Sequence, residues 1–246
     1  MDFTESQMER YSRQIMLREI GGLGQARLLA AGVVVLGTGA LGSVAALYLA
    51  AAGVGHITLI DGAAVTAATP EHAVVYARSQ IGSPKSLAAA HALHNLNPDV
   101  QITSVVAHWT EGMATPWLAG CQLLLDCGNR PESTRILARM CRERALPLIV
   151  ARREMLWGAV FTLHGGERSL SGVEESLLVQ QKTVFGQDVS PDGQRSVLAG
   201  LVANAAASEV IKVVLGMPSP DQTLQFFDAA TATWSMVKAA PFSSGS

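Results

Sequence analysis

Three glycines at a strand-to-helix junction are the residues of this sequence that point most directly to chemistry. Gly37, Gly39 and Gly42 form a Gly-x-Gly-x-x-Gly turn between the apolar run "VVVL" and a small-residue segment. In that context the first glycine permits a tight turn, the second lets backbone approach a phosphate, and the third allows close helix–sheet packing. The helix N-terminus adds free N–H groups and a positive dipole end. The turn therefore predicts a nucleotide site.

A carboxylate follows the next predicted strand and is the second candidate binding residue. Asp61 ends the segment "HITLID", where its oxygens can accept hydrogen bonds from a ribose diol. The same turn and carboxylate serve NAD or ATP, so these residues alone leave the nucleotide open. An NAD-dependent oxidoreductase is one alternative, although no residue set resembles an acid/base pair for hydride transfer. In the other alternative the glycines serve packing alone.

The elements that must position these residues alternate between strands and helices. The predicted strands are 33–36, 57–60, 100–106, 123–127 and 148–151, and the predicted helices are 4–19, 40–52, 85–95 and 132–145. Strands alternating with helices indicate βαβ units with right-handed crossovers. We therefore predict an α/β fold with a Rossmann-like, doubly wound and mainly parallel sheet, preceded by N-terminal helices.

The remaining third of the chain predicts a mixed or antiparallel extension of that sheet. A hairpin strand, a long apolar helix over 196–216 and two strands around the turn "DAATAT" follow one another. We predict a single domain over 1–246, divided into N-terminal helices (1–30), a Rossmann-like core (31–152), a mobile crossover (165–195) and a C-terminal helix with strands (196–238).

Composition excludes several classes of partner. The chain is 49% hydrophobic and 15% charged with a net charge of -2, which gives no reason to expect nucleic acid or an anionic membrane. Its apolar stretches are interrupted by glycine or charge well short of a membrane span, and no signal peptide is recognisable. The three cysteines form no Cys-x-x-Cys pair, so we expect a cytoplasmic protein with reduced thiols and no structural zinc.

A set of motifs in a fixed order favours ATP over NAD as the nucleotide. The segment "RYSRQ" precedes the glycine turn, and "GTGALGS", "GVGHITLID", "IGSPK", "LNPDV", "LLLDC", "SEVIKVVLG" and "LQFFDAATATW" follow in order. Together these resemble the ThiF/MoeB/HesA family, the bacterial relatives of ubiquitin-activating enzymes. The resemblance runs from about residue 9 to residue 238 and implies a fold that binds ATP and adenylates the C-terminal glycine of a ubiquitin-like or sulfur-carrier protein.

The resemblance also assigns roles to individual residues. It gives the ribose to Asp61, and it gives the phosphates to the turn residues Gly37, Gly39, Ala40 and Gly42. Arg13 matches an arginine that reaches a phosphate from the neighbouring subunit, which implies a homodimer or a heterodimer with a family member. Lys85, at the start of a predicted helix, matches a lysine that neutralises charge on the leaving pyrophosphate.

Several positions depart from the family pattern. A second aspartate falls on Ala63, an arginine falls on His72, and the Mg²⁺-binding aspartate falls on Asn129. An amide is a poorer Mg²⁺ ligand than a carboxylate, and a histidine cannot copy a bidentate guanidinium. We hypothesise that Arg152 or Arg153, expected just beyond the fifth strand, replaces the lost guanidinium.

The departures leave two interpretations within the family. The chain is either an adenylyltransferase with weakened or lost activity, or an inactive partner or scaffold subunit of the same fold. His91 and His94 share a predicted helix face, but no third ligand of clear register joins them, so we assign no metal site.

Overall fold

The computed structural model describes residues 3–110, 117–128, 130–154, 156–164, 196–219 and 223–238. Two helices open the chain, α1 (Glu5–Ile15) and α2 (Gly21–Ala30). Thr4 caps α1, because its Oγ1 accepts from the Gln7 N–H at 3.2 Å while the Gln7 side chain accepts from the Thr4 N–H at 3.1 Å. This reciprocal pair is a capping box.

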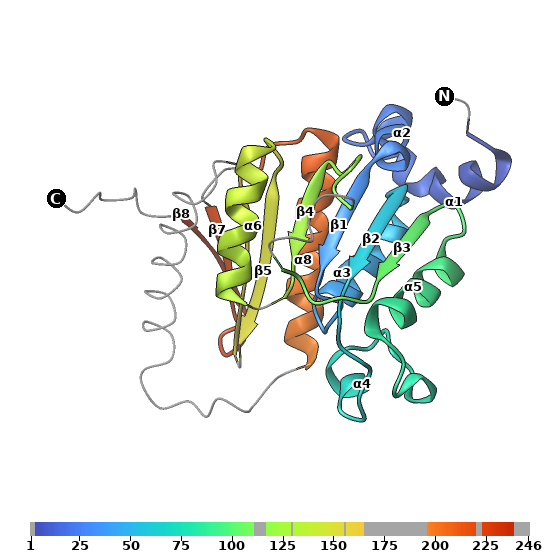
Figure 1. The fold of residues 1–246 in the computed structure, drawn as a ribbon. Helices are drawn as coiled ribbons and strands as arrows, with labels where there is room; N and C mark the ends of the chain where they lie inside the picture. Colours follow the sequence, from blue (N-terminus) through green and yellow to red (C-terminus); the bar gives the residue numbers. More distant parts are fainter. Residues whose placement is uncertain are drawn as a thin grey trace.

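Strands and helices then alternate through the parallel half of the fold (Figure 1). In order these are β1 (Gly32–Leu36), α3 (Gly42–Ala51), β2 (His56–Ile60), α4 (Thr69–His72), the 3-10 turn η1 (Arg78–Gln80), α5 (Lys85–Leu96), β3 (Gln101–Val105), β4 (Leu123–Asp126), α6 (Pro131–Glu143) and β5 (Leu148–Glu154). The second half contains β6 (Trp157–Leu163), α8 (Ser196–Leu215), β7 (Thr223–Asp228) and β8 (Thr233–Lys238).

Within the described residues, eight strands form one sheet in the order β3-β2-β1-β4-β5-β6-β7-β8. Strands β3 to β5 are parallel, and β6, β7 and β8 join them in antiparallel fashion. The predicted mainly parallel sheet with an antiparallel extension is confirmed. The chain winds outward from β1 to β3 and then crosses back to β4, so the switch of direction lies between β1 and β4. In open α/β sheets ligands bind outside the carboxyl ends of strands at such a switch point.

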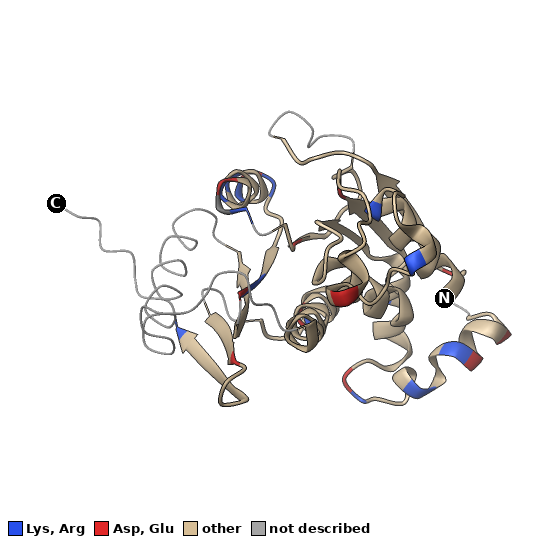
Figure 2. Cartoon of the chain, turned by 90° about the horizontal axis from the view of Figure 1, so that it is seen from below, with Lys and Arg blue, Asp and Glu red and all other residues tan. Residues whose placement is uncertain are grey.

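Helices cover the two faces of the sheet unequally. Helices α3, α5 and α8 pack against one face, where small and aliphatic side chains such as Ala45, Ala89 and Ala203 are fully buried. Helix α6 covers β4 and β5 on the other face, with Leu137 and Cys141 directed inward. In Figure 2 the blue and red segments that mark charged residues are frequent on the outer helices α1 and α6.

Helix α8 corrects one expectation from the sequence. Its 20 residues reach the length and hydropathy of a membrane span, although the sequence analysis expected no apolar stretch to do so. Leu198, Val202 and Val210 on this helix are buried. The helix contacts α3, β5 and β6, so its apolar surface is used in the core of the fold.

Strand β5 corrects a second expectation. It was expected to end at Ala151, but it continues to Glu154 because β6 pairs with it residue by residue from Leu148 to Glu154. Arg152 and Arg153 therefore lie within the strand and point to opposite faces of the sheet. The crossover predicted over 165–195 lies outside the described residues, and the division of the chain into four parts stays a prediction.

Candidate functional site

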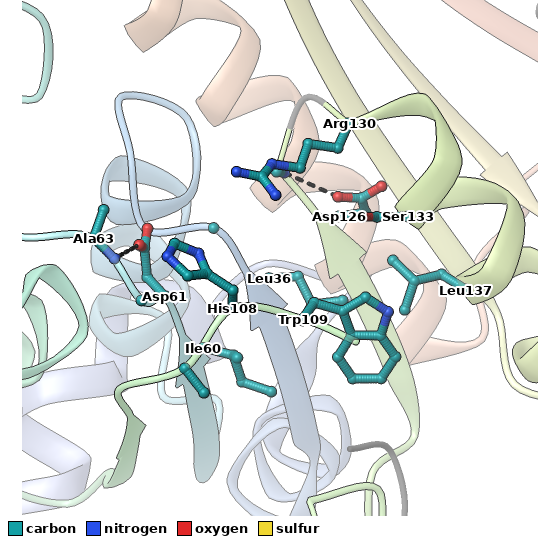
Figure 3. Close-up of a pocket in the computed structure, with 14 residues that line it drawn as sticks. Leu36, Ile60, Asp61, Ala63, His108, Trp109, Asp126, Arg130, Ser133 and Leu137 are labelled. Carbon is teal, nitrogen blue, oxygen red and sulfur yellow. Dashed lines mark hydrogen bonds between the residues drawn. The ribbon is translucent and has the colours of Figure 1, made fainter. Parts of the chain in front are cut away.

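A pocket opens at the carboxyl ends of β1, β2 and β4, the edge that the strand order selects (Figure 3). Its lining consists of Leu36, Gly37, Ile60, Asp61, Gly62, Ala63, Ala107, His108, Trp109, Asp126, Gly128, Arg130, Ser133 and Leu137. Apolar side chains form one part of the wall, and two carboxylates, a histidine and an arginine form the other. A concave site with an apolar wall and a few convergent polar groups is the usual form of a small-molecule site.

The glycine turn has the geometry that the motif predicts. Gly37 adopts φ +80°, a left-handed conformation that other residues rarely take. A Cβ on Gly42 would lie 1.8 Å from the carbonyl oxygen of Gly37, so the helix can approach the turn this closely only with glycine there. A Cβ on Gly39, by contrast, would meet no atom within 4 Å. The turn is tightly packed on its inner side and open at Gly39, where the motif places a phosphate.

Asp61 closes the turn through hydrogen bonds to backbone. Its Oδ2 accepts from the Thr38 N–H at 2.8 Å and from the Thr38 hydroxyl at 3.2 Å, and its Oδ1 accepts from the Ala63 N–H at 2.8 Å. A carboxylate offers about four acceptor positions. Oδ1 therefore keeps an acceptor position for a hydroxyl of a ligand.

Tyr76 joins the glycine turn to the start of α5. Its hydroxyl contacts the carbonyl oxygen of Thr38 and, at 3.3 Å, that of Lys85. Burial raises the pKa of the Tyr76 phenol well above its ordinary value. Lys85 itself begins α5, is half-buried, and has no hydrogen-bond or ion-pair partner for its ammonium among the described residues. The backbone of Lys85 is thus linked to the glycine turn, although Lys85 does not line the pocket itself.

Asp126, at the end of β4, has a charged hydrogen-bond partner, unlike Asp61. Its side chain is 3% exposed and its Oδ2 lies 2.7 Å from Arg152 Nη2, whose own side chain is 10% exposed. The Thr134 hydroxyl donates to the same oxygen at 2.6 Å, and the Gly128 N–H donates to Oδ1 at 2.9 Å. Arg152 also contacts the Thr134 hydroxyl and donates to the carbonyl oxygen of Asp126 at 3.3 Å. Strands β4 and β5 and helix α6 are tied together at this buried ion pair.

Among the pocket residues that the sequence does not single out, His108, Trp109 and Arg130 have the largest polar or aromatic side chains. His108 and Trp109 follow β3, and Arg130 precedes α6. Trp109 Nε1 is buried with no hydrogen-bond partner within the described ranges. Figure 3 shows the Arg130 guanidinium extending over the pocket from the β4–α6 connection. Their positions just after the strands β3 and β4 were the available signal, because the carboxyl ends of parallel strands meet at one edge.

Other predicted residues lie away from this pocket. Arg13 is exposed near the end of α1, and His72 lines a groove with Val44, Tyr48 and Asn204. Arg153 is partly buried, which lowers the pKa of its guanidinium, and Glu71 opposes that shift. Asn129 lies outside the described residues.

Helix α1 is fixed to the body of the protein by polar side chains. Arg10 Nε lies 3.4 Å from Asp99 Oδ2, and Asn97 Nδ2 donates to the Tyr11 hydroxyl at 2.8 Å. Gln14 donates to the carbonyl oxygen of Ala52 at 3.0 Å. These contacts set the direction of the helix that carries Arg13.

The three cysteines have ordinary structural surroundings. Cys127 and Cys141 are buried, as expected for core positions, and Cys121 is half-buried. Burial raises the pKa of Cys121 to about 11 and that of Cys141 to about 12. Such thiols are protonated at neutral pH and react slowly as nucleophiles. No group of three His, Cys, Asp or Glu side chains is arranged to hold a metal in the part of the chain that the structure describes.

Comparisons with known proteins agree with this architecture. Residues 11–245 match the ThiF family. The SAMP-activating enzyme E1 of Haloferax volcanii is 32% identical over 237 residues, covering 94% of this chain and 85% of that relative. The molybdopterin-synthase adenylyltransferase of Salmonella typhimurium is 31% identical over 247 residues, covering 96% of this chain and 94% of that relative. E. coli MccB, solved with ATP, shares the fold with a TM-score of 0.75 and 17% identity, over 94% of this chain and 71% of MccB. Since the family match and both relatives extend over nearly the whole sequence, this chain belongs to the ThiF family.

Proposed function

We propose that this protein binds ATP in the pocket between β2 and β4 and adenylates the C-terminal carboxylate of a ubiquitin-like or sulfur-carrier protein, at a reduced rate. The observation that carries ATP binding is Asp61. This carboxylate is bonded to the glycine turn by Thr38, yet its Oδ1 keeps an acceptor position for a ribose hydroxyl. The molybdopterin-synthase adenylyltransferase of Salmonella typhimurium, a relative of matching length, supports the reaction class.

The proposed reaction transfers AMP to an acyl oxygen. A carboxylate oxygen of the carrier attacks the α-phosphorus of ATP, and the bond between that phosphorus and the bridging oxygen of the pyrophosphate breaks. The products are an acyl-adenylate and pyrophosphate. Because charge accumulates on the leaving group, a positioned cation accelerates this step. Lys85 is suited to that role, since its ammonium has no partner within the described residues and its backbone is joined to the turn by Tyr76.

Two positions account for the reduced rate. Ala63 contributes only its N–H, which donates to Asp61, where the family resemblance expects an acidic side chain. His72 lies in the groove with Val44 and Tyr48 instead of lining the pocket with Asp61. Losing one preorganised charge contact costs roughly 10² to 10³ in rate, so the two changes together slow adenylation strongly.

The proposal includes a dimer, in which Arg13 serves the site of the neighbouring copy. Arg13 is exposed and does not line the pocket of its own chain. Near it, Met16 and Leu17 are exposed, and a groove between the α1–α2 connection, α3 and α8 contains Tyr48 and Ile211. If a second copy of the chain packed against this apolar surface, the Arg13 residues of both copies would lie at the interface between them. Sedimentation at rising concentration tests this part, and a monomer at all concentrations would contradict it.

A catalytically inactive partner subunit is the second candidate function, favoured by the displacement of His72 from the pocket. Calorimetric titration with ATP, and with NAD as a control, followed by a pyrophosphate-exchange assay with candidate carrier proteins, separates the possibilities. ATP binding with exchange supports the slow enzyme. ATP binding without exchange favours the partner subunit, and NAD binding alone would favour an oxidoreductase.

A further inference from the structure

The two carboxylates in the pocket have little capacity left for a metal ion. Asp126 uses both oxygens, one toward the Gly128 N–H at 2.9 Å and the other toward Arg152 at 2.7 Å and Thr134 at 2.6 Å. Asp61 accepts three hydrogen bonds from Thr38 and Ala63. Each oxygen of Asp126 therefore already has a donor at short distance.

Mg²⁺ is the ion that the family resemblance implies, and these residues do not fit it. Mg²⁺ requires near-octahedral oxygen ligands and is usually held through one or two carboxylates together with substrate phosphates. At Asp126 the guanidinium of Arg152 already occupies the position beside Oδ2, and a divalent cation added there would be repelled by it. The aspartate that binds Mg²⁺ in the family is replaced by Asn129, a neutral residue.

Arg130 offers a cation of the protein's own. It lines the pocket next to Gly128, its side chain is exposed, and its guanidinium has no hydrogen-bond or ion-pair partner among the described residues. It directly precedes α6, whose N-terminal end adds positive potential at the same place. A guanidinium binds phosphate oxygens in bidentate fashion and stays charged at every physiological pH.

We infer that the site binds its nucleotide without a divalent metal, with Arg130 neutralising the polyphosphate and Arg152 keeping Asp126 out of metal coordination. This inference rests on the proposed binding of ATP. Arg130 contacts the ligand, whereas Arg152 acts by holding Asp126 to β5 and Thr134. The positive charge that a metal would supply comes instead from Arg130, the residue that precedes α6.

Calorimetric titration of the full chain with ATP, once with excess Mg²⁺ and once with excess EDTA, tests the inference. We expect the two dissociation constants to agree within about 2-fold, because no ligand for the metal is lost or gained at the protein. Arg130→Gln should weaken ATP binding roughly 10- to 100-fold in both solutions, as expected for loss of a charged hydrogen-bond donor. Arg142→Gln is the matched control, because Arg142 is an exposed arginine in the last turn of α6 that does not line the pocket, and it should leave the affinity unchanged.

The outcomes separate this inference from the proposed function. ATP binding that disappears in EDTA, or an Arg130→Gln protein that binds as tightly as the parent, overturns the metal-free site while leaving ATP binding intact. Absence of ATP binding in both solutions overturns the proposed function and this inference with it. Thermal unfolding of each variant confirms that it is folded before titration.

Discussion

Strands β2 and β4 lie on either side of β1, and each is followed or ended by an aspartate, Asp61 at β2 and Asp126 at β4. The two carboxylates have different hydrogen-bond partners. Asp61 is half-buried, and its donors within the described residues are neutral, namely the N–H groups of Thr38 and Ala63 and the Thr38 hydroxyl. Asp126 is almost fully buried and paired with the guanidinium of Arg152. Neutral donors shape a loop and leave the negative charge available, whereas a buried guanidinium cancels it.

The two carboxylates of the pocket therefore differ in what holds them, because Asp61 belongs to a hydrogen-bonded loop whereas Asp126 belongs to a buried ion pair. On the β2 side, hydrogen bonds join the glycine turn to Asp61 through Thr38 and to the backbone of Lys85 through Tyr76. The β4 side joins β4, β5 and α6 through one ion pair. Variants on the two sides should therefore differ in whether they change stability or affinity.

Arg152→Met should have the largest effect. It leaves the carboxylate of Asp126 buried without its countercharge, and removing one partner of a buried pair costs about 3–5 kcal/mol. Urea unfolding measures the loss. Arg142→Met, on an exposed position of α6, should change the free energy of unfolding little. If Asp126→Asn in the Arg152→Met background restores no stability, the loss does not come from the unpaired charge.

Gly42→Ala should be the next most damaging change. The new methyl group would sit 1.8 Å from the carbonyl oxygen of Gly37, and overpacking of this kind costs about 1–3 kcal/mol. Gly39→Ala is the matched control, since its methyl group meets no atom within 4 Å. Thermal unfolding of the two variants side by side measures the contrast. Equal stability of both would show that the turn is not close-packed at Gly42.

Asp61→Asn should change ATP affinity more than stability, in contrast to the two preceding variants. The amide oxygen still accepts from the turn, so we expect a loss of about 1 kcal/mol in stability. ATP affinity should fall roughly 10-fold, because a charged acceptor for the ribose is replaced by a neutral one. Titration with ATP alongside urea unfolding gives both numbers, and Asp99→Asn at the α1 contact controls for the charge change. An unchanged affinity would remove Asp61 from the site.

Tyr76→Phe should have the smallest effect at neutral pH. It removes the hydroxyl that bridges Thr38 and Lys85, at a cost of about 0.5–1.5 kcal/mol. Urea unfolding measures it, and Tyr48→Phe on an exposed position is the control. A Tyr76→Phe protein as stable as the parent would contradict a bridging role.

The same tyrosine predicts a dependence on alkaline pH. Burial raises the pKa of Tyr76 above its ordinary value of 10.0, so above pH 10 the folded state binds more protons than the unfolded state. Stability should accordingly be fully present below pH 10 and fall as pH rises further, by at most about 1.4 kcal/mol per pH unit from this group. Urea unfolding from pH 9 to pH 11 should show a shallower decline in Tyr76→Phe. Parallel declines in both proteins would assign the effect to other groups.

Much of the fold followed from local patterns in the sequence. Alternating strands and helices predicted the parallel half, and the helix predicted over 4–19 begins within one residue of α1. The glycine turn and Asp61 likewise lie together as the motif required, because both depend on residues near each other in the chain.

Local sequence patterns do not predict which residues from distant segments come into contact. The pairing of Asp126 with Arg152 depends on the length of β5, which β6 extends by pairing as far as Glu154. His108, Trp109 and Arg130 were missed because nothing in their local sequence distinguishes them from loop residues. Only the strand order brings them to one pocket.

The Tyr76 bridge has a consequence for how a nucleotide is received. The carbonyl oxygens of Thr38 and Lys85 share one buried hydroxyl, so the glycine turn and the start of α5 are joined directly. Their relative placement is set when the chain folds. A nucleotide bound as proposed would therefore lose little free energy to ordering the protein, and a larger part of its contact energy would remain as affinity.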